Sequence, residues 1–276
     1  MLKPVRIYSL NVGGLNSKYD LGLIDNIFLN NDIICISETR TNHIENFKFS
    51  GFKAIEMPKK IDHHKFGGIH GLCVYVKDEI YGDVHLMNDF TQSESVLWFK
   101  LSNRTRSFSM YIGAVYVPHE ASKYNHKDIF HNLELDVATL KSQHDIPFIL
   151  IGDFHSRVGV LSDFISVDES LSELFGLENN NEIFEIFQNH NVPVFRANED
   201  QFINENGKKL IEFCEITKLR IMNGRIGHDK EIGEFVGFTG MGKSAIDLVL
   251  GFLGILFVLL YTSTVQMLSL PGGLIP

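Results

Sequence analysis

The chain has 276 residues, of which 44% are hydrophobic and 21% charged, and this is the composition of an ordinary globular protein. This length accommodates one large α/β domain or two small ones with a sizeable core. The formal net charge of −9 argues against a protein that coats nucleic acid by bulk electrostatics, although it permits an enzyme that places a bound cation against phosphates.

The three cysteines each lie in an apolar stretch, and none forms a CxxC pair. Such residues are typical of the reduced core of an intracellular protein. The N-terminal residues lead directly into a strand pattern and do not resemble a signal peptide. We therefore expect an intracellular protein, nuclear or cytoplasmic, that is not secreted.

The first part of the chain predicts a strand, a helix and a second strand. Residues 5–12 alternate as a strand that ends at Asn11 and a glycine pair, and residues 32–38 form a short apolar strand that ends at Glu38. Between them, Asp20 is placed to cap a helix whose apolar residues recur at helical spacing over 21–28. This unit puts Asn11 and Glu38 at the same edge of one sheet.

The same patterns predict further strands over residues 47–57, 67–77, 94–101, 108–117, 219–225, 234–239 and 244–250, and helices over 129–140, 180–190 and 208–216. The strands at 94–101 and 108–117 read as an antiparallel pair joined by a polar turn. Tyr116 lies at the end of the second, where it either packs on the sheet or belongs to a site. His63 and His64 are adjacent, but the lysines around them favour a solvated loop over a metal site.

Asp153 follows a continuous apolar run over residues 148–151 and a glycine. The run predicts a strand that is buried on both faces. The carboxylate would then lie at the carboxyl end of a central strand, where open α/β sheets bind ligands. The alternative is that Gly152 and Asp153 only begin a turn.

Asp247 is a carboxylate within the otherwise apolar stretch 245–250. A buried acid that lacks a partner costs several kcal/mol or holds a proton. Asp247 is therefore either a site residue or a structural hydrogen-bond acceptor. No Asp, Glu, Lys, Arg or His follows it in the 29 remaining residues, which read as a core segment, a membrane helix or a segment foreign to the domain. A membrane span needs about 20 apolar residues, and this segment reaches that length only with four polar residues included.

Several polar residues thus lie at or near the ends of apolar strands: Asn11, Glu38, Tyr116, Asp153, His155 and Asp247. Carboxylate oxygens in such a place suit a hard cation such as Mg²⁺, which is held by one or two carboxylates together with substrate phosphate. The set predicts metal-assisted hydrolysis of a phosphate ester.

Five motifs in this order resemble the endonuclease/exonuclease/phosphatase superfamily, and above all the apurinic-type endonuclease domains of non-LTR retrotransposons. The motifs span residues 10–14, 37–39, 115–118, 151–155 and 244–248, and the resemblance covers residues 5–250. It implies a four-layer α/β sandwich of two packed mixed β-sheets flanked by helices, with an incomplete C-terminal strand. Residues 1–250 would form this domain, and residues 251–276 an apolar tail foreign to it.

The resemblance also implies roles for single residues. Glu38 would bind Mg²⁺, or Mn²⁺ in its place, with Asn11 beside it, and Tyr116 would contact the scissile phosphate. Asp153 would orient or deprotonate the attacking water. Asp247 would orient a catalytic histidine, and the substrate would also meet His119 and Thr239.

Two departures from the family pattern bear on activity. His155 stands where the family has the asparagine of Gly-Asp-x-Asn, and it would have to stabilise the transition state in its place. The family's terminal Ser-Asp-His segment, which carries a main catalytic group, has no counterpart, since no histidine follows His228. Losing such a group costs roughly 10²–10⁴ in rate.

We therefore expect a Mg²⁺-dependent DNA-nicking endonuclease of a retroelement, impaired by the loss of this histidine. The alternatives are a degenerate copy without catalysis and a phosphatase of the same superfamily. DNA is the expected partner, and the apolar tail leaves a membrane as a second option.

Overall fold

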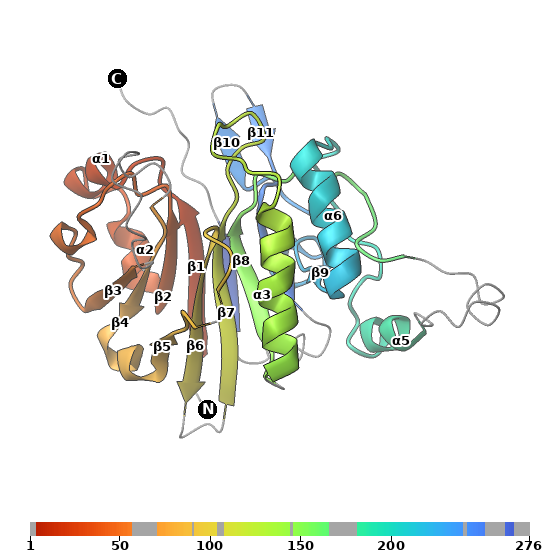
Figure 1. Ribbon diagram of the computed structural model, residues 1–276, viewed down its shortest axis with the longest axis horizontal. Coiled ribbons are helices and arrows are strands. Elements are labelled where there is room, and N and C mark those ends of the chain that lie inside the picture. Colours follow the sequence, from red (N-terminus) through yellow and green to blue (C-terminus); the bar gives the residue numbers. More distant parts are fainter. Residues whose placement is uncertain are drawn as a thin grey trace.

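The computed structural model describes residues 4–56, 71–89, 91–103, 108–143, 146–165, 181–239, 242–251 and 263–267. Two mixed β-sheets pack face to face, and helices cover their outer faces (Figure 1). The predicted four-layer α/β sandwich is thereby confirmed. His63 and His64 lie outside the described residues.

The first sheet has five strands in the order β13-β1-β2-β4-β3. They are β1 (Val5–Asn11), β2 (Ile33–Ser37), β3 (Phe52–Glu56), β4 (Cys73–Lys77) and β13 (Ser263–Met267). β1 runs parallel to β2 and to β13, whereas β4 is antiparallel to β2 and β3. The parallel pairing carries the ends of β1 and β2 to the same edge of the sheet, as the sequence predicts.

The second sheet has six strands in the order β5-β6-β7-β8-β12-β9. They are β5 (Val84–Leu86), β6 (Val96–Asn103), β7 (Phe108–Tyr116), β8 (Phe148–Asp153), β9 (Arg220–Ile221) and β12 (Asp247–Gly251). β6 and β7 form the predicted antiparallel pair, and β7 runs parallel to β8. β10 (Gly237–Thr239) and β11 (Gly242–Ser244) form a separate hairpin.

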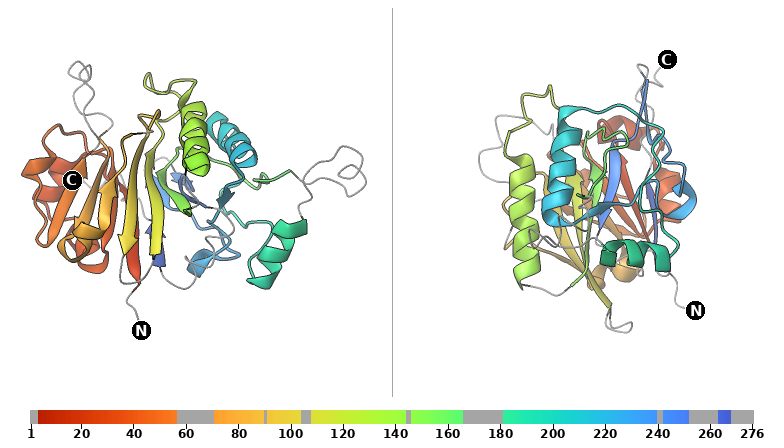
Figure 2. Two further views of the ribbon diagram at one scale, coloured as in Figure 1. Left: turned by 60° about the horizontal axis from the view of Figure 1, so that its bottom comes forward. Right: turned by 90° about the vertical axis from the view of Figure 1, so that its right-hand side faces the viewer.

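The helices are α1 (Leu15–Asp20), α2 (Asp25–Asn30), α3 (Ile129–Gln143), α5 (Asn181–Asn189) and α6 (Glu205–Thr217). Three 3-10 turns are η1 (Ile44–Asn46), η3 (Asp78–Asp83) and η5 (Gly227–Asp229). α1 and α2 cover the outer face of the first sheet, and α3 and α6 lie side by side on the outer face of the second (Figure 2). One apolar core fills the space between the sheets, and two more lie under the helices.

Several predicted elements differ in their bounds, and two of these differences have a structural cause. The helix predicted over 21–28 begins later, as α2 at Asp25, because Gly22 adopts a positive φ of 64° in the turn that separates α1 from α2. Asp20 is therefore the last residue of α1 and not a cap of the next helix. Helix α6 begins three residues before the predicted start at Lys208, since the Asn204 side chain accepts a hydrogen bond from the Gly207 amide and caps it.

The C-terminal segment contributes to the first sheet. β13 pairs in parallel with β1, with Val5 opposite Ser263 and Ser9 opposite Met267. The foreign origin of residues 251–276 stays a prediction, but part of them completes an edge of the sandwich. Among the described residues, no helix combines the length and apolar character needed to cross a membrane. The three cysteines are buried and free, as predicted.

Gly152 lets β7 and β8 approach closely just before Asp153. Its φ is 154°, and an added Cβ would lie 2.0 Å from the carbonyl oxygen of Val115. Because that atom belongs to the backbone of the neighbouring strand, no side-chain movement relieves the overlap. Glycine is therefore required directly before the site carboxylate.

We predict that Gly152→Ala destabilises the fold by about 2–4 kcal/mol through overpacking and backbone strain. Urea unfolding followed by circular dichroism measures the change. Gly82→Ala in η3 is the matched control, since an added Cβ there meets nothing within 4 Å, and its midpoint should stay close to that of the wild type. Equal midpoints for the Gly152 variant and the wild type would contradict the packing argument.

Candidate functional site

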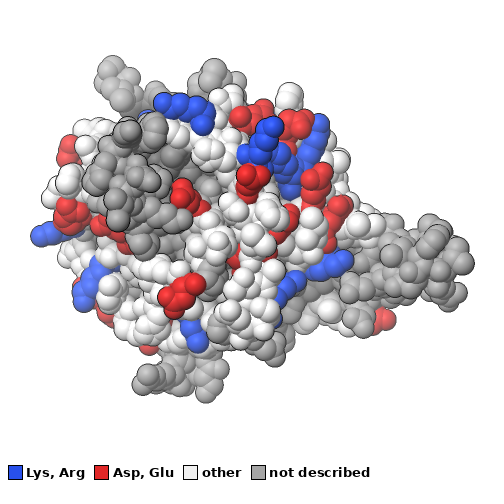
Figure 3. All heavy atoms as spheres, in the orientation of Figure 1, with Lys and Arg blue, Asp and Glu red and all other residues white. Residues whose placement is uncertain are grey.

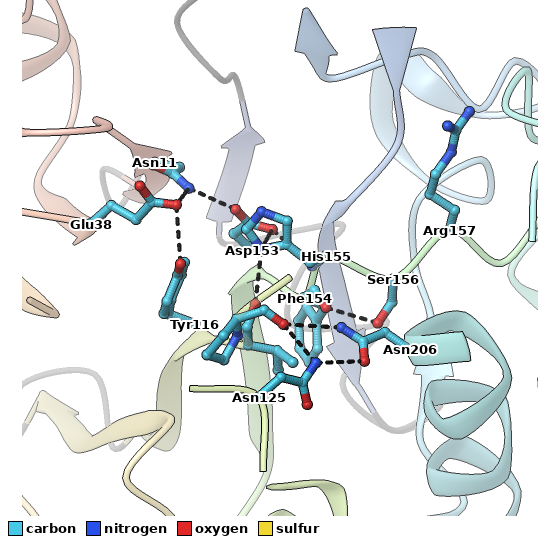
Figure 4. Close-up of polar contacts among 12 residues, drawn as sticks. Asn11, Glu38, Tyr116, Asn125, Asp153, Phe154, His155, Ser156, Arg157 and Asn206 are labelled. Carbon is cyan, nitrogen blue, oxygen red and sulfur yellow. Dashed lines mark hydrogen bonds and ion pairs between the residues drawn. The ribbon is translucent and has the colours of Figure 1, made fainter. Parts of the chain in front are cut away.

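Four strand ends converge at one edge of the two sheets. Asn11 ends β1, Glu38 follows β2, Tyr116 ends β7 and Asp153 ends β8. The register sets Asn11 opposite Ser37 and Tyr116 opposite Asp153, so each pair of neighbouring parallel strands presents its terminal side chains together. The structure thus brings together residues that are far apart in the chain (Figure 4).

The amide of Asn11 connects the two sheets. Its Nδ2 donates to Glu38 Oε1 at 3.0 Å and to Asp153 Oδ2 at 2.8 Å. The Tyr116 hydroxyl donates to the same Glu38 oxygen at 3.0 Å. Two carboxylates from different sheets are therefore held in one hydrogen-bond network (Figure 4).

The two carboxylates differ in their electrostatic environment. Burial alone would raise the pKa of Glu38, but hydrogen bonds from Asn11 and Arg40, together with the positive charge of Arg40, lower it below its usual value. Burial raises the pKa of Asp153 against the opposing effect of His155. Burial and the nearby Glu38 also raise the pKa of Tyr116, which keeps its hydroxyl protonated as a donor. Glu38 is thus an anion suited to a cation, and Asp153 is the stronger base.

His155 occupies an uncommon backbone conformation beside Asp153. Its φ is 43°, in the left-handed region, where Asn, Asp and His are the enriched residues other than glycine. Its amide donates to Asp153 Oδ1 at 2.9 Å, and its carbonyl accepts from Asn204 Nδ2 at 2.9 Å. Glu38 has a similar φ of 50°. Two site residues therefore sit in sparsely populated conformations that their neighbours hold in place.

Asp247 lies directly opposite Asp153 in the antiparallel pair of β12 and β8. It is buried as expected, at 1% exposure. Neither of its carboxylate oxygens has a hydrogen-bond partner in the described part of the chain. Burial, and then the charge of Asp153, raise its pKa well above the usual value. The predicted histidine partner is thus missing from the described residues around Asp247.

The two residues predicted to contact the substrate, His119 and Thr239, lie on different elements. The exposed ring of His119 lies 5.7 Å from that of His155, at an interplanar angle of 84°. Thr239 ends β10 and pairs with Gly242 in the hairpin. The roles of both residues stay predictions.

The loop after Asp153 depends on polar contacts that the sequence analysis did not identify. Arg157 makes two bonds to the Asp200 carboxylate, from Nε at 2.8 Å and from a terminal nitrogen at 2.6 Å. Asn204 caps α6 and also accepts from the Arg157 amide at 2.9 Å. The sequence contains one signal of this arrangement, an asparagine just before a helical pattern.

Two asparagines, Asn125 and Asn206, fix the segment that carries His119. The side-chain amides of Asn125 and Asn206 both donate to the Pro118 carbonyl, at 3.0 and 3.1 Å. Asn125 also donates to Asn206 Oδ1 at 3.1 Å (Figure 4). These contacts join the end of β7 to the first turn of α6 and so position the rim of the site.

The donor set suits a cation. One ligand atom from each of Glu38, Asp153 and His155 lies within 4.8 Å of the others, and no other group of three or more potential ligands occurs among the described residues. Arg40 forms an ion pair with Glu38 Oε2 at 2.5 Å and is itself half exposed. The residues present therefore fit a divalent ion, with Glu38 and Asp153 as its carboxylates.

The part of the chain that supplies most of this site matches a known protein family. A sequence model of the endonuclease/exonuclease/phosphatase family matches residues 8–154, which is more than half of the chain. The chain belongs to this family. The match includes Asn11, Glu38, Tyr116 and Asp153, the four strand-end residues described above. A comparison with curated protein sequences finds no match.

Solved structures agree on the fold. An AP endonuclease from Leishmania major has 14% sequence identity and a TM-score of 0.60, over 91% of this chain and 79% of that one. The endonuclease domain of TRAS1, a telomere-specific non-LTR retrotransposon, has 12% identity and a TM-score of 0.56, over 92% and 88%. A 3′-5′ exonuclease from Neisseria meningitidis has 15% identity and a TM-score of 0.55, over 90% and 87%. At these identities the likeness shows the shared fold.

The unpaired Asp247 carboxyl predicts a pH-dependent effect of Asp247→Asn on stability. An acid with a raised pKa in the folded state favours folding at low pH, and the folded state loses this advantage as pH rises above about 4, where the unfolded acid ionises. Asp247→Asn has no carboxyl that ionises at this position, so its folded state does not lose stability in this way as the pH rises. We expect it to match the wild type near pH 4 and to be more stable by about 1–3 kcal/mol at pH 8.

Thermal and urea unfolding at both pH values measure this difference. The exposed Asp89 provides a control, since Asp89→Asn should leave the pH dependence unchanged. A destabilised Asp247→Asn protein at pH 8 would show instead that a donor pairs the carboxylate.

Proposed function

We propose that the protein hydrolyses phosphodiester bonds of DNA with the aid of a divalent cation, and that it works as a weak nicking endonuclease. The observation that carries the proposal is the Asn11 amide that holds Glu38 and Asp153 together at the strand ends. Membership of the family supports the reaction class. The likeness to an AP endonuclease and to a retrotransposon endonuclease domain supports DNA as the substrate.

Each site residue has a role that follows from its contacts. Glu38, with its lowered pKa, holds the cation, and Asn11 and Tyr116 fix the orientation of its carboxylate. Asp153, with its raised pKa, offers one carboxylate oxygen to the cation and accepts a proton from the attacking water on the other. His155 and His119 face the substrate from the neighbouring loops. A bound divalent cation supplies positive charge that stabilises the developing charge on the phosphate.

The surface charge is consistent with a reaction that depends on a cation. On the face shown in Figure 3, the described residues carry acidic and basic side chains interspersed and form no broad basic stripe. With a net charge of −9, the protein has little long-range attraction for a polyanion. We therefore expect binding of DNA to be weak without the cation.

The unpaired Asp247 supports the view that activity is low. In the proposed mechanism, a histidine beside Asp247 would protonate the leaving group or stabilise the charged phosphate. Neither oxygen of Asp247 meets such a donor among the described residues. The second candidate function, a degenerate copy without catalysis, is favoured by this same observation.

A nicking assay on supercoiled plasmid tests the proposal. We expect slow relaxation with Mg²⁺, none with EDTA, and a loss of at least about 100-fold in Glu38→Gln, because removing a catalytic electrostatic contact has effects of this order. Glu212→Gln is the control, since Glu212 is an exposed residue of α6 on the outer face of the second sheet. Equal relaxation by Glu38→Gln and the wild type would exclude catalysis at this site.

Further assays of the same purified protein distinguish the phosphatase from the degenerate copy. Release of phosphate from inositol phosphates or from DNA 3′ ends, without nicking, would favour the phosphatase. Absence of every Mg²⁺-dependent activity would favour the degenerate copy.

Supplying the absent histidine gives a complementary prediction. A chimera that keeps residues 1–250 and continues with a family segment ending in Ser-Asp-His should nick DNA roughly 10²–10⁴ times faster. The added segment must also provide a strand for β1, which β13 now pairs. A version of the chimera with alanine in place of the grafted histidine should return to the original rate. An equal rate in both chimeras would show that Asp247 does not act through a histidine.

A further inference from the structure

His155 distinguishes this site from one built of oxygen ligands alone. Among the described residues it is the only nitrogen donor in the group with Glu38 and Asp153, and each of the three offers a ligand atom within 4.8 Å of the others. Its side chain is 16% exposed, so the ring borders the site and solvent reaches it from one side. An imidazole in this place can either contact substrate or bind the cation directly.

The hydrogen bonds of the ring determine which nitrogen is available. His155 Nδ1 lies 2.8 Å from the Val117 carbonyl oxygen and 3.2 Å from Asp153 Oδ1. A carbonyl can only accept, so Nδ1 carries the proton, and the lone pair of the neutral ring lies on Nε2. Histidines that bind metals usually have this arrangement, with one ring nitrogen donating to a carbonyl or carboxylate and the other binding the ion.

The backbone fixes the ring further. The left-handed conformation of His155 is held by its amide bond to Asp153 and by the bond from Asn204 to its carbonyl. The rings of Tyr116 and His155 pack in a T-shaped arrangement, with their centroids 5.8 Å apart. A ligand held from several sides loses little freedom when it binds an ion.

We propose, as an extension of the proposed function and resting on it, that His155 is a nitrogen ligand of the cation together with Glu38 and Asp153. Two carboxylates and one imidazole form a mixed donor set, which binds Mn²⁺, Co²⁺ or Zn²⁺ more tightly than an all-oxygen set does. Mg²⁺ gains little, because it prefers oxygen ligands and keeps its waters. The protein therefore selects a transition-metal ion over Mg²⁺ at equal concentration.

Metal binding without DNA tests this assignment. Pulsed electron paramagnetic resonance of the Mn²⁺-loaded full-length protein should show ¹⁴N coupling from a bound imidazole. The coupling should disappear in His155→Asn, which keeps a residue that tolerates the left-handed conformation. Calorimetric titration should show that the same variant loses at least about tenfold in Co²⁺ affinity, whereas its Mg²⁺ affinity changes by less than about threefold.

Two further variants identify the source of the nitrogen. His131→Gln removes a largely exposed histidine on α3 and should leave the coupling intact. His119→Gln removes the ring that stacks edge-on against His155 and should also leave it intact. Loss of the coupling in His119→Gln but not in His155→Asn would assign the ligand to His119 and overturn the proposal. Melting curves of each variant show whether it is folded.

The remaining outcomes separate this inference from the proposed function. Bound Mn²⁺ without ¹⁴N coupling would overturn the role of His155 and leave Mg²⁺-dependent nicking intact. Nitrogen-coupled Mn²⁺ without nicking would support the metal site while rejecting the endonuclease.

Discussion

The site depends on a single side-chain amide that bonds to carboxylates from two sheets. Asn11 donates to Glu38 at the end of β2 and to Asp153 at the end of β8. Each sheet supplies one acid, and two nearby carboxylates would repel each other without a donor between them. The apolar core between the sheets sets the spacing at which one amide spans both groups. The chemistry of the site is therefore a consequence of how the two sheets pack.

The same packing explains why Asp247 is a burden to the fold. It extends the face of the second sheet that carries Ile149, Ile151 and Val249 into the inter-sheet core, directly opposite Asp153. A carboxyl at the end of an apolar layer is stable when a donor meets it and costly when none does. The Asp247 carboxyl without a hydrogen-bond donor therefore lowers the stability of the fold at neutral pH.

Local sequence patterns predicted the strand ends well and the loops poorly. Asp153 and Glu38 could be found because apolar runs stop at them, and parallel pairing within each sheet then sets Glu38 near Asn11 and Asp153 opposite Tyr116. The turn at Gly22 between α1 and α2 could not be predicted from the apolar spacing, which recurs over residues 21–28. The contact of Arg157 with Asp200 joins residues 43 apart in loops without periodicity, so no local pattern reports it. Tertiary hydrogen bonds of this kind are fixed by the fold and not by the neighbouring sequence.

The C-terminal segment meets the backbone requirement of β1 for a partner strand, which differs from the requirement of the Asp247 side chain for a donor. β1 needs a neighbour for its main-chain groups, and Ser263–Met267, with its Thr and Val, provides one. Edge pairing of this type uses backbone hydrogen bonds and accepts many sequences. The Asp247 carboxyl needs one particular donor at one position, which a merely strand-forming sequence does not supply. Among the described residues, β1 therefore has a partner strand while the Asp247 carboxyl has no donor.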